Sequence, residues 1–140
     1  MRISVKTKGN FQKTIKKLAD KLEMTDFLFD LSIILNGKIK TRVQKNGQGV
    51  KGSLEAYTNK YKRFRNKRGR QSNFRDLTLS GSMFQSLTQE KLNKNEVRMF
   101  FAGKDNNKKA YFNDKRTPFF ELTTNERQFI RTELTKFSKL

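Results

Sequence analysis

A long amphipathic pattern constrains the fold of this chain more than any other feature of the sequence. From Thr25 to about Lys45, leucine and isoleucine recur every three or four residues, which predicts a helix with one buried face. Acidic residues lie in its first turns and basic residues toward its end, the order that the helix dipole favours. Asn46-Gly47 is a suitable end for such a helix. The buried stripe is expected to consist of Leu28, Leu31, Leu35 and Ile39.

The other patterns predict an α+β fold rather than one built from βαβ units. The further expected elements are a strand over 2–6 and a helix after Asn10 with Phe11, Ile15, Leu18 and Leu22 on one face. Strands are expected over 84–92 and 96–102 around a turn at 93–95, with Val97, Met99 and Phe101 alternating on one face. A last helix is expected behind the capping-box pattern Thr123-x-x-Glu126, with Ile130, Leu134 and Phe137 on one face. A loop is expected from Gly103 to Asp114. The predicted architecture is therefore two N-terminal helices, a small antiparallel sheet or hairpin, a long basic loop and a C-terminal helix.

Residues 1–140 are expected to form a single domain, because a chain of 140 residues suits one domain with one core. The segment after Gly47 has no helical or strand period and is too long for an ordinary connection. We therefore expect a long basic loop or arm at about 47–76. Either it contains a short helix that starts at Thr58 and carries Tyr61 and Phe64, or it is ordered only by partners, or both hold.

This loop concentrates the positive charge of a strongly basic chain. The sequence has 32 Lys and Arg against 13 Asp and Glu, a formal charge of +19, which attracts polyanions or acidic partners. Cations interleaved with aromatic rings suit phosphates and bases, although a basic run can also be a solvated surface. The expected polyanion or partner contacts are Lys60, Lys62, Arg63, Arg65, Lys67, Arg68, Arg70 and Arg75.

The sequence offers little for catalysis. It contains no His and no Cys, so the commonest general base, metal ligand and strong nucleophile are missing. The Gly47–Gly52 segment matches a dinucleotide-binding spacing but follows a helix rather than a strand. Asp105, Asp114 and Glu121 could in principle serve a metal-dependent nuclease, but solvated loop acids are far commoner. We therefore expect no enzyme, no cofactor and no metal site. No apolar run approaches the roughly 18 residues of a membrane span, so a soluble protein without a membrane partner is expected.

Several short motifs in the middle of the chain resemble one known family. They are Gly47-Gln48-Gly49 with Gly52, Tyr57-Thr58 with Tyr61, the basic run with Arg65 and Arg68-Gly69-Arg70, and Asp76-Leu77-Thr78-x-Ser80-Gly81-x-Met83 followed by Ser86-Leu87. In this order they resemble the minor virion morphogenesis proteins of tailed bacteriophages, the tail-completion or neck proteins that join a filled head to a tail. The resemblance extends more weakly to Ala110-Tyr111-Phe112-Asn113 and Arg116-x-Pro118-Phe119-Phe120.

The resemblance implies a structural subunit of a homo-oligomeric ring of six or twelve copies in the virion neck. The implied partners are other neck, portal-side and tail proteins of the phage, and packaged DNA in the channel is a further candidate. The protein would be made and assembled in the cytoplasm of the bacterial host. The alternative from a different class is a basic nucleic-acid-binding module of the ribosomal-protein type, which would show the same charge and the same Arg-rich loop.

The motif residues also have a structural interpretation. Thr78 and Ser80 can bond local backbone groups, Gly81 permits a tight reversal, and Leu77 and Met83 are expected to anchor the turn in the core. Leu79 is expected to act with these two anchors, and Pro118-Phe119-Phe120 is expected to be a core anchor or a subunit contact.

Overall fold

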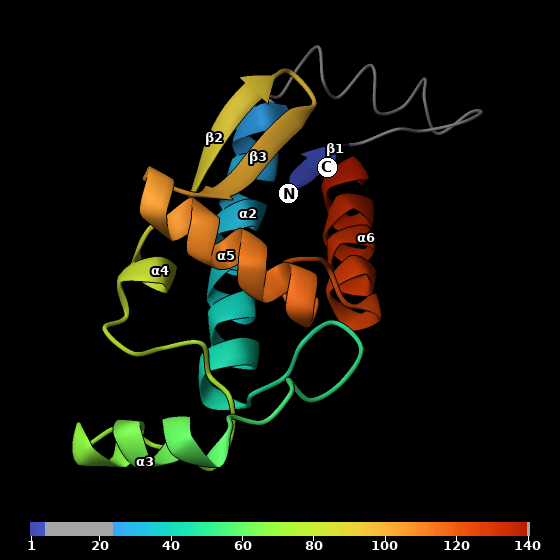
Figure 1. Cartoon of the computed structure of the whole chain (residues 1–140). Helices are drawn as coiled ribbons and strands as arrows, with labels where there is room; N and C mark the ends of the chain where they lie inside the picture. The colour runs from blue at the N-terminus through green and yellow to red at the C-terminus, as the bar shows by residue number, and fades with distance from the viewer. Residues whose placement is uncertain (5–23, 140) are drawn as a thin grey trace. The chain divides into compact units, whose positions relative to one another are not determined.

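The computed structural model describes residues 1–4 and 24–139. Its elements, in chain order, are β1 (Arg2–Ser4), α2 (Met24–Lys40) continued by a π-helical turn (Thr41–Lys45), α3 (Asn59–Lys67), α4 (Ser82–Gln85), β2 (Leu87–Asn93), β3 (Glu96–Phe101), α5 (Lys104–Arg116) and α6 (Thr124–Ser138), as labelled in Figure 1. The predicted α+β class is confirmed. The helix expected after Asn10 lies outside the described residues.

The long amphipathic helix forms as predicted. Leu28, Leu35 and Ile39 are fully buried and Leu31 nearly so. The helix ends where expected, since the Asn46 N–H donates to the carbonyl of Val43 and Gly47 follows with φ of +61°. A Cβ at Gly47 would lie 2.6 Å from Cδ2 of Phe74, so both the backbone angle and the available space require glycine there.

The small sheet has the strand order β1-β3-β2. β1 runs antiparallel to β3, with Arg2 opposite Arg98 and Ile3 opposite Val97. Every second residue of β3 is buried, as the alternating pattern predicted. The prediction that the preceding strand begins at Phe84 is wrong, because Phe84 belongs to the short helix α4 and β2 begins at Leu87.

The chain divides into two compact units. The first comprises Met1–Leu35, Thr88–Phe100 and Leu122–Leu140, and the second comprises Asn36–Leu87 and Phe101–Glu121. In the described part of the first unit, the rings of Phe27 and Phe137 stack with centroids 4.2 Å apart. The second unit has an aromatic cluster in which Phe84, Phe101 and Phe119 meet at centroid distances of 5.9–6.1 Å. The aromatic residues thus supply much of the core of the second unit.

Helix α5 overturns the expectation of a loop from Gly103 to Asp114. Ala110 is the buried residue of this helix, so the sequence shows no apolar period there. The helix is instead favoured by Asp105 in its first turn and basic residues in its last turn. Asp114 also holds the segment that follows α5, because its Oδ1 accepts hydrogen bonds from the N–H groups of Phe119 and Phe120 at 2.8 Å each.

The last helix begins at the predicted capping box. The Thr123 hydroxyl accepts the Glu126 N–H at 3.2 Å, and the Glu126 carboxylate accepts the Thr123 N–H at 2.8 Å. Ile130 is buried on the predicted apolar face.

Candidate functional site: a basic helix and an arginine-lined cavity

The basic loop contains the short helix that the sequence allowed for, α3. Thr58 caps it, with its hydroxyl accepting the Tyr61 N–H at 3.3 Å. The helix ends at Lys67, and Gly69 follows it with φ of +66°, so that the Arg70 N–H returns to the carbonyl of Arg65 at 3.0 Å. Both ends of α3 are therefore set by local sequence signals.

Arg65 is the buried residue of α3, with 1% of its surface exposed. Its guanidinium donates from Nε to the carbonyl of Gln71 at 2.8 Å and from Nη1 to the carbonyl of Thr78 at 2.6 Å. Its Nη2 donates to both carboxylate oxygens of Asp76 at 3.0 Å. The prediction that Arg65 contacts an external polyanion is thus corrected, because all three nitrogens of this side chain are engaged inside the protein.

The Asp76 carboxylate accepts hydrogen bonds from several segments besides α3. The Tyr57 hydroxyl donates to its Oδ1 at 2.9 Å and the Gln71 amide to its Oδ2 at 2.7 Å. The Thr78 N–H donates to Oδ1 at 2.9 Å. Burial, together with the negative charge of Asp76, raises the pKa of Tyr57 to about 12. We call Tyr57, Arg65, Gln71, Asp76 and Thr78 the Asp76 network.

The turn that follows the Asp76 network has the local bonds expected of it. The Thr78 hydroxyl donates to the carbonyl of Asp76 at 3.0 Å, and Ser80 bonds the hydroxyl of Ser82 at 3.0 Å. Gly81 reverses the chain with φ of +86°, and Met83 is buried as predicted.

The prediction that Leu77 anchors this turn in the core is wrong. Leu77 is half-buried, has φ of +54° and lines a cavity, as Leu79 does. A positive φ is unusual for leucine, so the surrounding hydrogen bonds must hold the backbone there.

The Pro118-Phe119-Phe120 segment serves as the predicted core anchor chiefly through one ring. Phe119 is fully buried, whereas Phe120 is half-buried and Pro118 is exposed. The carbonyl of Pro118 accepts the Val50 N–H at 2.9 Å. A Cβ on Gly49 would come within 2.7 Å of the same carbonyl oxygen, so close backbone packing explains this glycine without a nucleotide.

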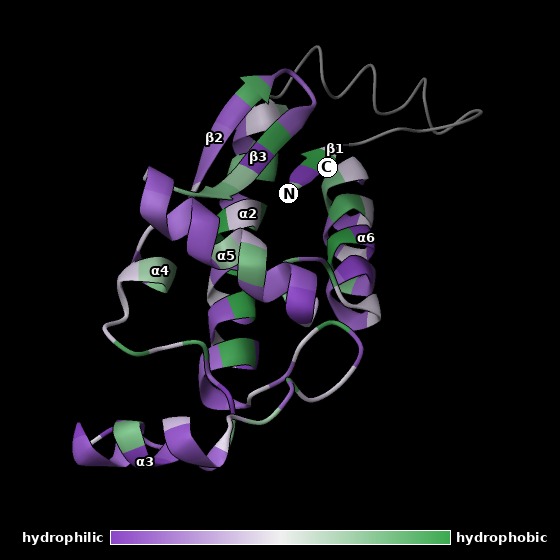
Figure 2. Ribbon diagram, in the orientation of Figure 1, coloured by the Kyte–Doolittle hydropathy of each residue, from purple (hydrophilic) through white to green (hydrophobic). Residues whose placement is uncertain are grey.

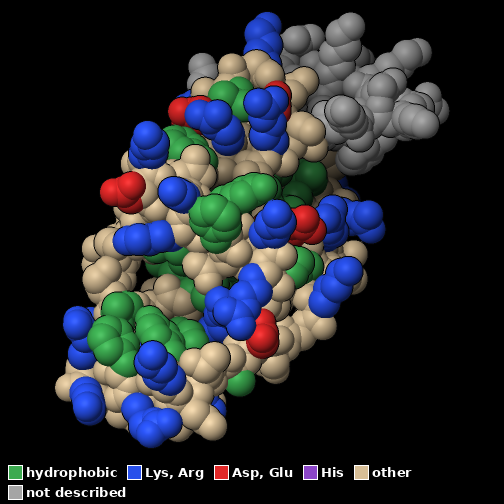
Figure 3. Space-filling model, in the orientation of Figure 1, with side chains coloured by type: hydrophobic (Ala, Val, Ile, Leu, Met, Phe, Trp, Pro, Cys, Tyr) green, Lys and Arg blue, Asp and Glu red, His purple; other side chains and the backbone are tan. Residues whose placement is uncertain are grey.

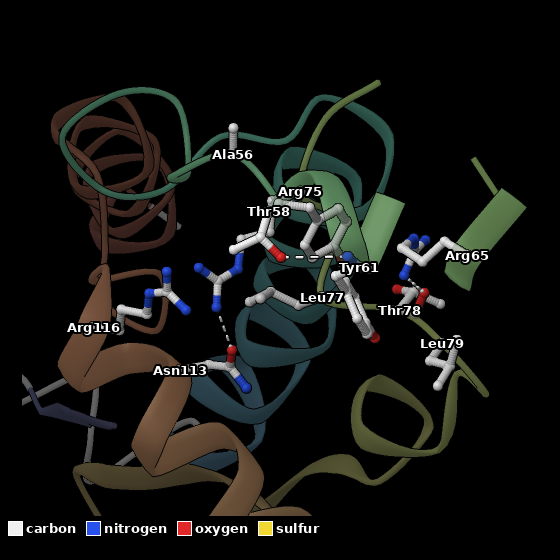
Figure 4. A pocket seen from close by; sticks show the side chains of 11 residues that line it. Ala56, Thr58, Tyr61, Arg65, Arg75, Leu77, Thr78, Leu79, Asn113 and Arg116 are labelled. Carbon is white, nitrogen blue, oxygen red and sulfur yellow. Dashed lines mark hydrogen bonds between the residues drawn. The ribbon is translucent and has the colours of Figure 1, made fainter. Parts of the chain in front are cut away.

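A cavity of about 400 Å³ opens beside the Asp76 network, and Figure 4 shows the side chains around it. Its lining includes Tyr57, Tyr61, Arg65, Arg75, Leu77 and Arg116. Arg75 is 7% exposed and donates from Nη2 to Oδ1 of Asn113 at 2.8 Å. Burial, and then the charge of Arg116, lowers the pKa of Arg75. Arg75 therefore lies inside the cavity rather than on the exposed basic surface, and its predicted role as a polyanion or partner contact stays a prediction.

Glu55 lies beside the two arginines of this cavity. Arg116 donates to its carboxylate from Nε at 2.7 Å and from Nη2 at 2.9 Å. Nη1 of Arg75 is 3.9 Å from the same carboxylate. The hydrogen bond from Arg116 and the charges of both arginines hold the pKa of Glu55 below its usual value. No sequence pattern indicates this pairing, because Glu55 and Arg116 lie far apart along the chain.

The remaining predicted cations lie on the surface around α3. Figure 3 shows Lys and Arg side chains around this helix. Lys62 is half-buried, and the exposed cations are Lys60, Arg63, Lys67, Arg68 and Arg70. Aromatic rings accompany them: Tyr61 stacks on Phe64 at 5.6 Å, and the guanidinium of Arg68 lies 4.4 Å from the centre of the Phe64 ring. We call this set of exposed cations the α3 basic surface.

The structure shows no arrangement for metal chemistry in residues 1–4 and 24–139. No group of three or more His, Asp or Glu there is placed to hold an ion. No helix within the same residues combines the length and apolarity needed to cross a membrane.

Comparison of the chain with known protein families, curated proteins and solved structures finds no match.

Proposed function

We propose that this protein is a structural subunit of the neck of a tailed bacteriophage, where a ring of six or twelve copies joins the head and portal to the tail. It performs no covalent chemistry in this role. The observation that carries the proposal is the Asp76 network, since it unites the separate motifs on which the resemblance to neck proteins depends.

The Asp76 network explains why these motifs occur together. Tyr57 belongs to the Tyr-Thr-x-x-Tyr element, Arg65 to the basic segment and Asp76 to the Leu-Thr-x-Ser-Gly-x-Met turn. In the structure the three side chains share one carboxylate. A polar network of this kind needs every partner, because a missing one leaves a buried group unpaired. The motifs therefore specify one local fold, which supports the idea that the resemblance reflects shared structure.

Exposed apolar side chains support assembly with other subunits. On α5, Tyr111 and Phe112 are 60% and 56% exposed and contact each other edge to face at 5.5 Å. On α2, Ile33 and Ile34 are each 48% exposed. Adjacent large apolar residues on a surface are typical of contacts with another protein. We propose that the ring covers Tyr111 and Phe112.

The α3 basic surface supplies the second contact of the proposed ring. A ring of copies that each carry a charge of +19 needs counter-charge. The α3 basic surface would therefore face DNA in the channel or an acidic surface of an adjacent ring.

The number of copies in the assembled protein tests this proposal. Native mass spectrometry and negative-stain images, taken over a range of protein concentrations, should show a closed ring of six or twelve copies. The double variant Tyr111→Ser/Phe112→Ser should lose the ring and keep its circular dichroism spectrum. The control variant Leu92→Ser removes an apolar side chain that is 38% exposed on β2 and should still form the ring. A chain that stays monomeric at every concentration contradicts the proposal.

The second candidate function, a nucleic-acid-binding module, is favoured by the pairing of cations with Phe64 on the α3 basic surface. If about five cations contact phosphates, the affinity for duplex DNA should fall with salt at a log–log slope of roughly −4.5. The variant Arg63→Gln/Lys67→Gln/Arg70→Gln should flatten the slope by about 2.7, that is roughly 0.9 for each lost contact. The matched control Lys45→Gln/Lys104→Gln/Lys108→Gln removes as much charge from exposed positions elsewhere and should leave the slope unchanged. Tight, salt-dependent binding by a permanent monomer would favour this candidate over the ring.

A further inference from the structure

We propose that the cavity between Arg75 and Arg116 binds the carboxylate of an aspartate or glutamate from an acidic segment of another protein. This carboxylate would take the place that Glu55 occupies in the chain by itself. The proposal does not depend on ring formation.

The positive charges of the Arg75 and Arg116 guanidinium groups favour the binding of an anion between them. Figure 4 shows that Arg75 and Arg116 point toward one another across the cavity. Like charges that face each other are unfavourable unless an anion lies between them. Arg75 is 7% exposed, so water screens its charge poorly.

The hydrogen bonds of Arg75 are incomplete. Its Nη2 is bonded to Asn113, but its buried Nε has no hydrogen-bond partner among the described residues. A buried donor without a partner is destabilising. The Nη1 of Arg75 lies 3.9 Å from the Glu55 carboxylate, which is beyond hydrogen-bond distance. A guanidinium has five donors in a planar fork that matches a carboxylate, so an incoming carboxylate can accept a hydrogen bond from Nη1 that Glu55 does not accept.

Glu55 shows that a carboxylate fits at this position, and the exposure of its side chain leaves room for Glu55 to be displaced. Its side chain is 54% exposed. The residue lies in an irregular segment that precedes α3. It forms two short hydrogen bonds with Arg116 but lies 3.9 Å from Arg75. An exposed ion pair of this kind is weak, so a carboxylate that reaches both arginines can displace Glu55.

The walls of the cavity favour a protein segment over a nucleic acid. Tyr57, Tyr61, Leu77 and Leu79 line it beside the arginines. These side chains can contact the apolar neighbours of an acidic residue in a peptide. A phosphate backbone would instead follow the α3 basic surface, whose cations are exposed, because the Arg75 guanidinium is buried. The charge of +19 also favours an acidic partner over a second copy of the same chain.

The test uses a short peptide with blocked ends and a single aspartate between two leucines, compared with its asparagine counterpart. Binding to the full chain is measured by calorimetry and by the NMR signals of the arginine Nε–H groups. The aspartate peptide should bind about tenfold more tightly than the asparagine peptide and shift the signals of Arg75 and Arg116. Arg116→Gln should lose this preference and keep its melting temperature, because Arg116 is an exposed residue.

Two variants of equal charge separate a specific site from general attraction. Glu55→Gln removes the internal competitor and should tighten peptide binding. Glu121→Gln removes one exposed negative charge elsewhere in the same unit and should leave binding unchanged. Equal binding of the two peptides, or an equal effect of the two variants, would overturn the proposal. A poly-dT oligonucleotide or inorganic phosphate that shifts the Arg75 and Arg116 signals more strongly than the peptide would overturn it in favour of a phosphate site.

Discussion

Helices α2 and α3 are held in place by opposite kinds of interaction. Helix α2 buries a stripe of leucine and isoleucine, whereas α3 buries an arginine. In Figure 2, α3 is coloured mainly as hydrophilic, while α2 alternates between hydrophobic and hydrophilic residues. Apolar burial is non-directional and spread over many contacts, but the bonds of Arg65 depend on particular partners. We expect α2 to tolerate the loss of one contact better than α3.

Loss of the Asp76 carboxylate should have the largest effect. Asp76→Ala leaves the buried charge of Arg65 without its partner, and breaking a buried pair in this way typically costs about 3–5 kcal/mol. Urea unfolding followed by circular dichroism measures the change. Because the two residues share one interaction, Asp76→Ala combined with Arg65→Met should cost less than the sum of the single variants, by about 0.5–3 kcal/mol. Strict additivity would show that the pair contributes little.

Truncation in α2 should come next. Leu35→Ala removes a fully buried side chain, which usually costs about 2–5 kcal/mol, with the exact cost set by how far the site collapses. The same urea experiment measures it. Ile34→Ala, at the neighbouring exposed position, is the control and should change stability little. If Leu35→Ala destabilises the protein more than Asp76→Ala, the comparison between the two helices is reversed.

Removal of the Tyr57 hydroxyl should have a smaller effect that depends on pH. Tyr57→Phe removes a hydrogen bond to the Asp76 carboxylate, and bonds to charged groups contribute about 1.5–3 kcal/mol to stability. Because Tyr57 is only half-buried, we expect a loss of stability near the lower value. Folding favours the protonated hydroxyl, because the pKa of Tyr57 is raised from 10.0 to about 12. Its contribution to stability is therefore fully present below pH 10 and is lost as the pH rises toward 12. Ultraviolet titration of tyrosinate should show a late component that Tyr57→Phe lacks.

The cap of α3 should have the smallest effect. Thr58→Ala removes the side chain that accepts the Tyr61 N–H and should cost about 1 kcal/mol. Hydrogen exchange at the first turn of α3 should speed up while exchange in α2 stays the same. Unchanged exchange in α3 would indicate that the Asp76 network, not the cap, determines whether this helix forms.

Local signals were sufficient for much of the fold. The apolar period gave α2, the Thr123-x-x-Glu126 pattern gave the start of α6, and the alternation of Val97 and Met99 gave β3. Thr58 and Gly69 mark the two ends of α3 in the same way. Each of these signals acts between residues a few positions apart, so the sequence by itself determined these elements.

The tertiary structure alone decided the roles of the charged side chains. Arg63 and Arg65 belong to the same basic run, yet one is exposed and the other is buried against Asp76. Arg75 reaches Asn113, and Glu55 reaches Arg116, across long stretches of chain. A cation is found on the surface or in the interior according to whether folding brings it partners that replace water. Those partners come from distant segments, so residue type and spacing along the chain could not identify which cations are structural.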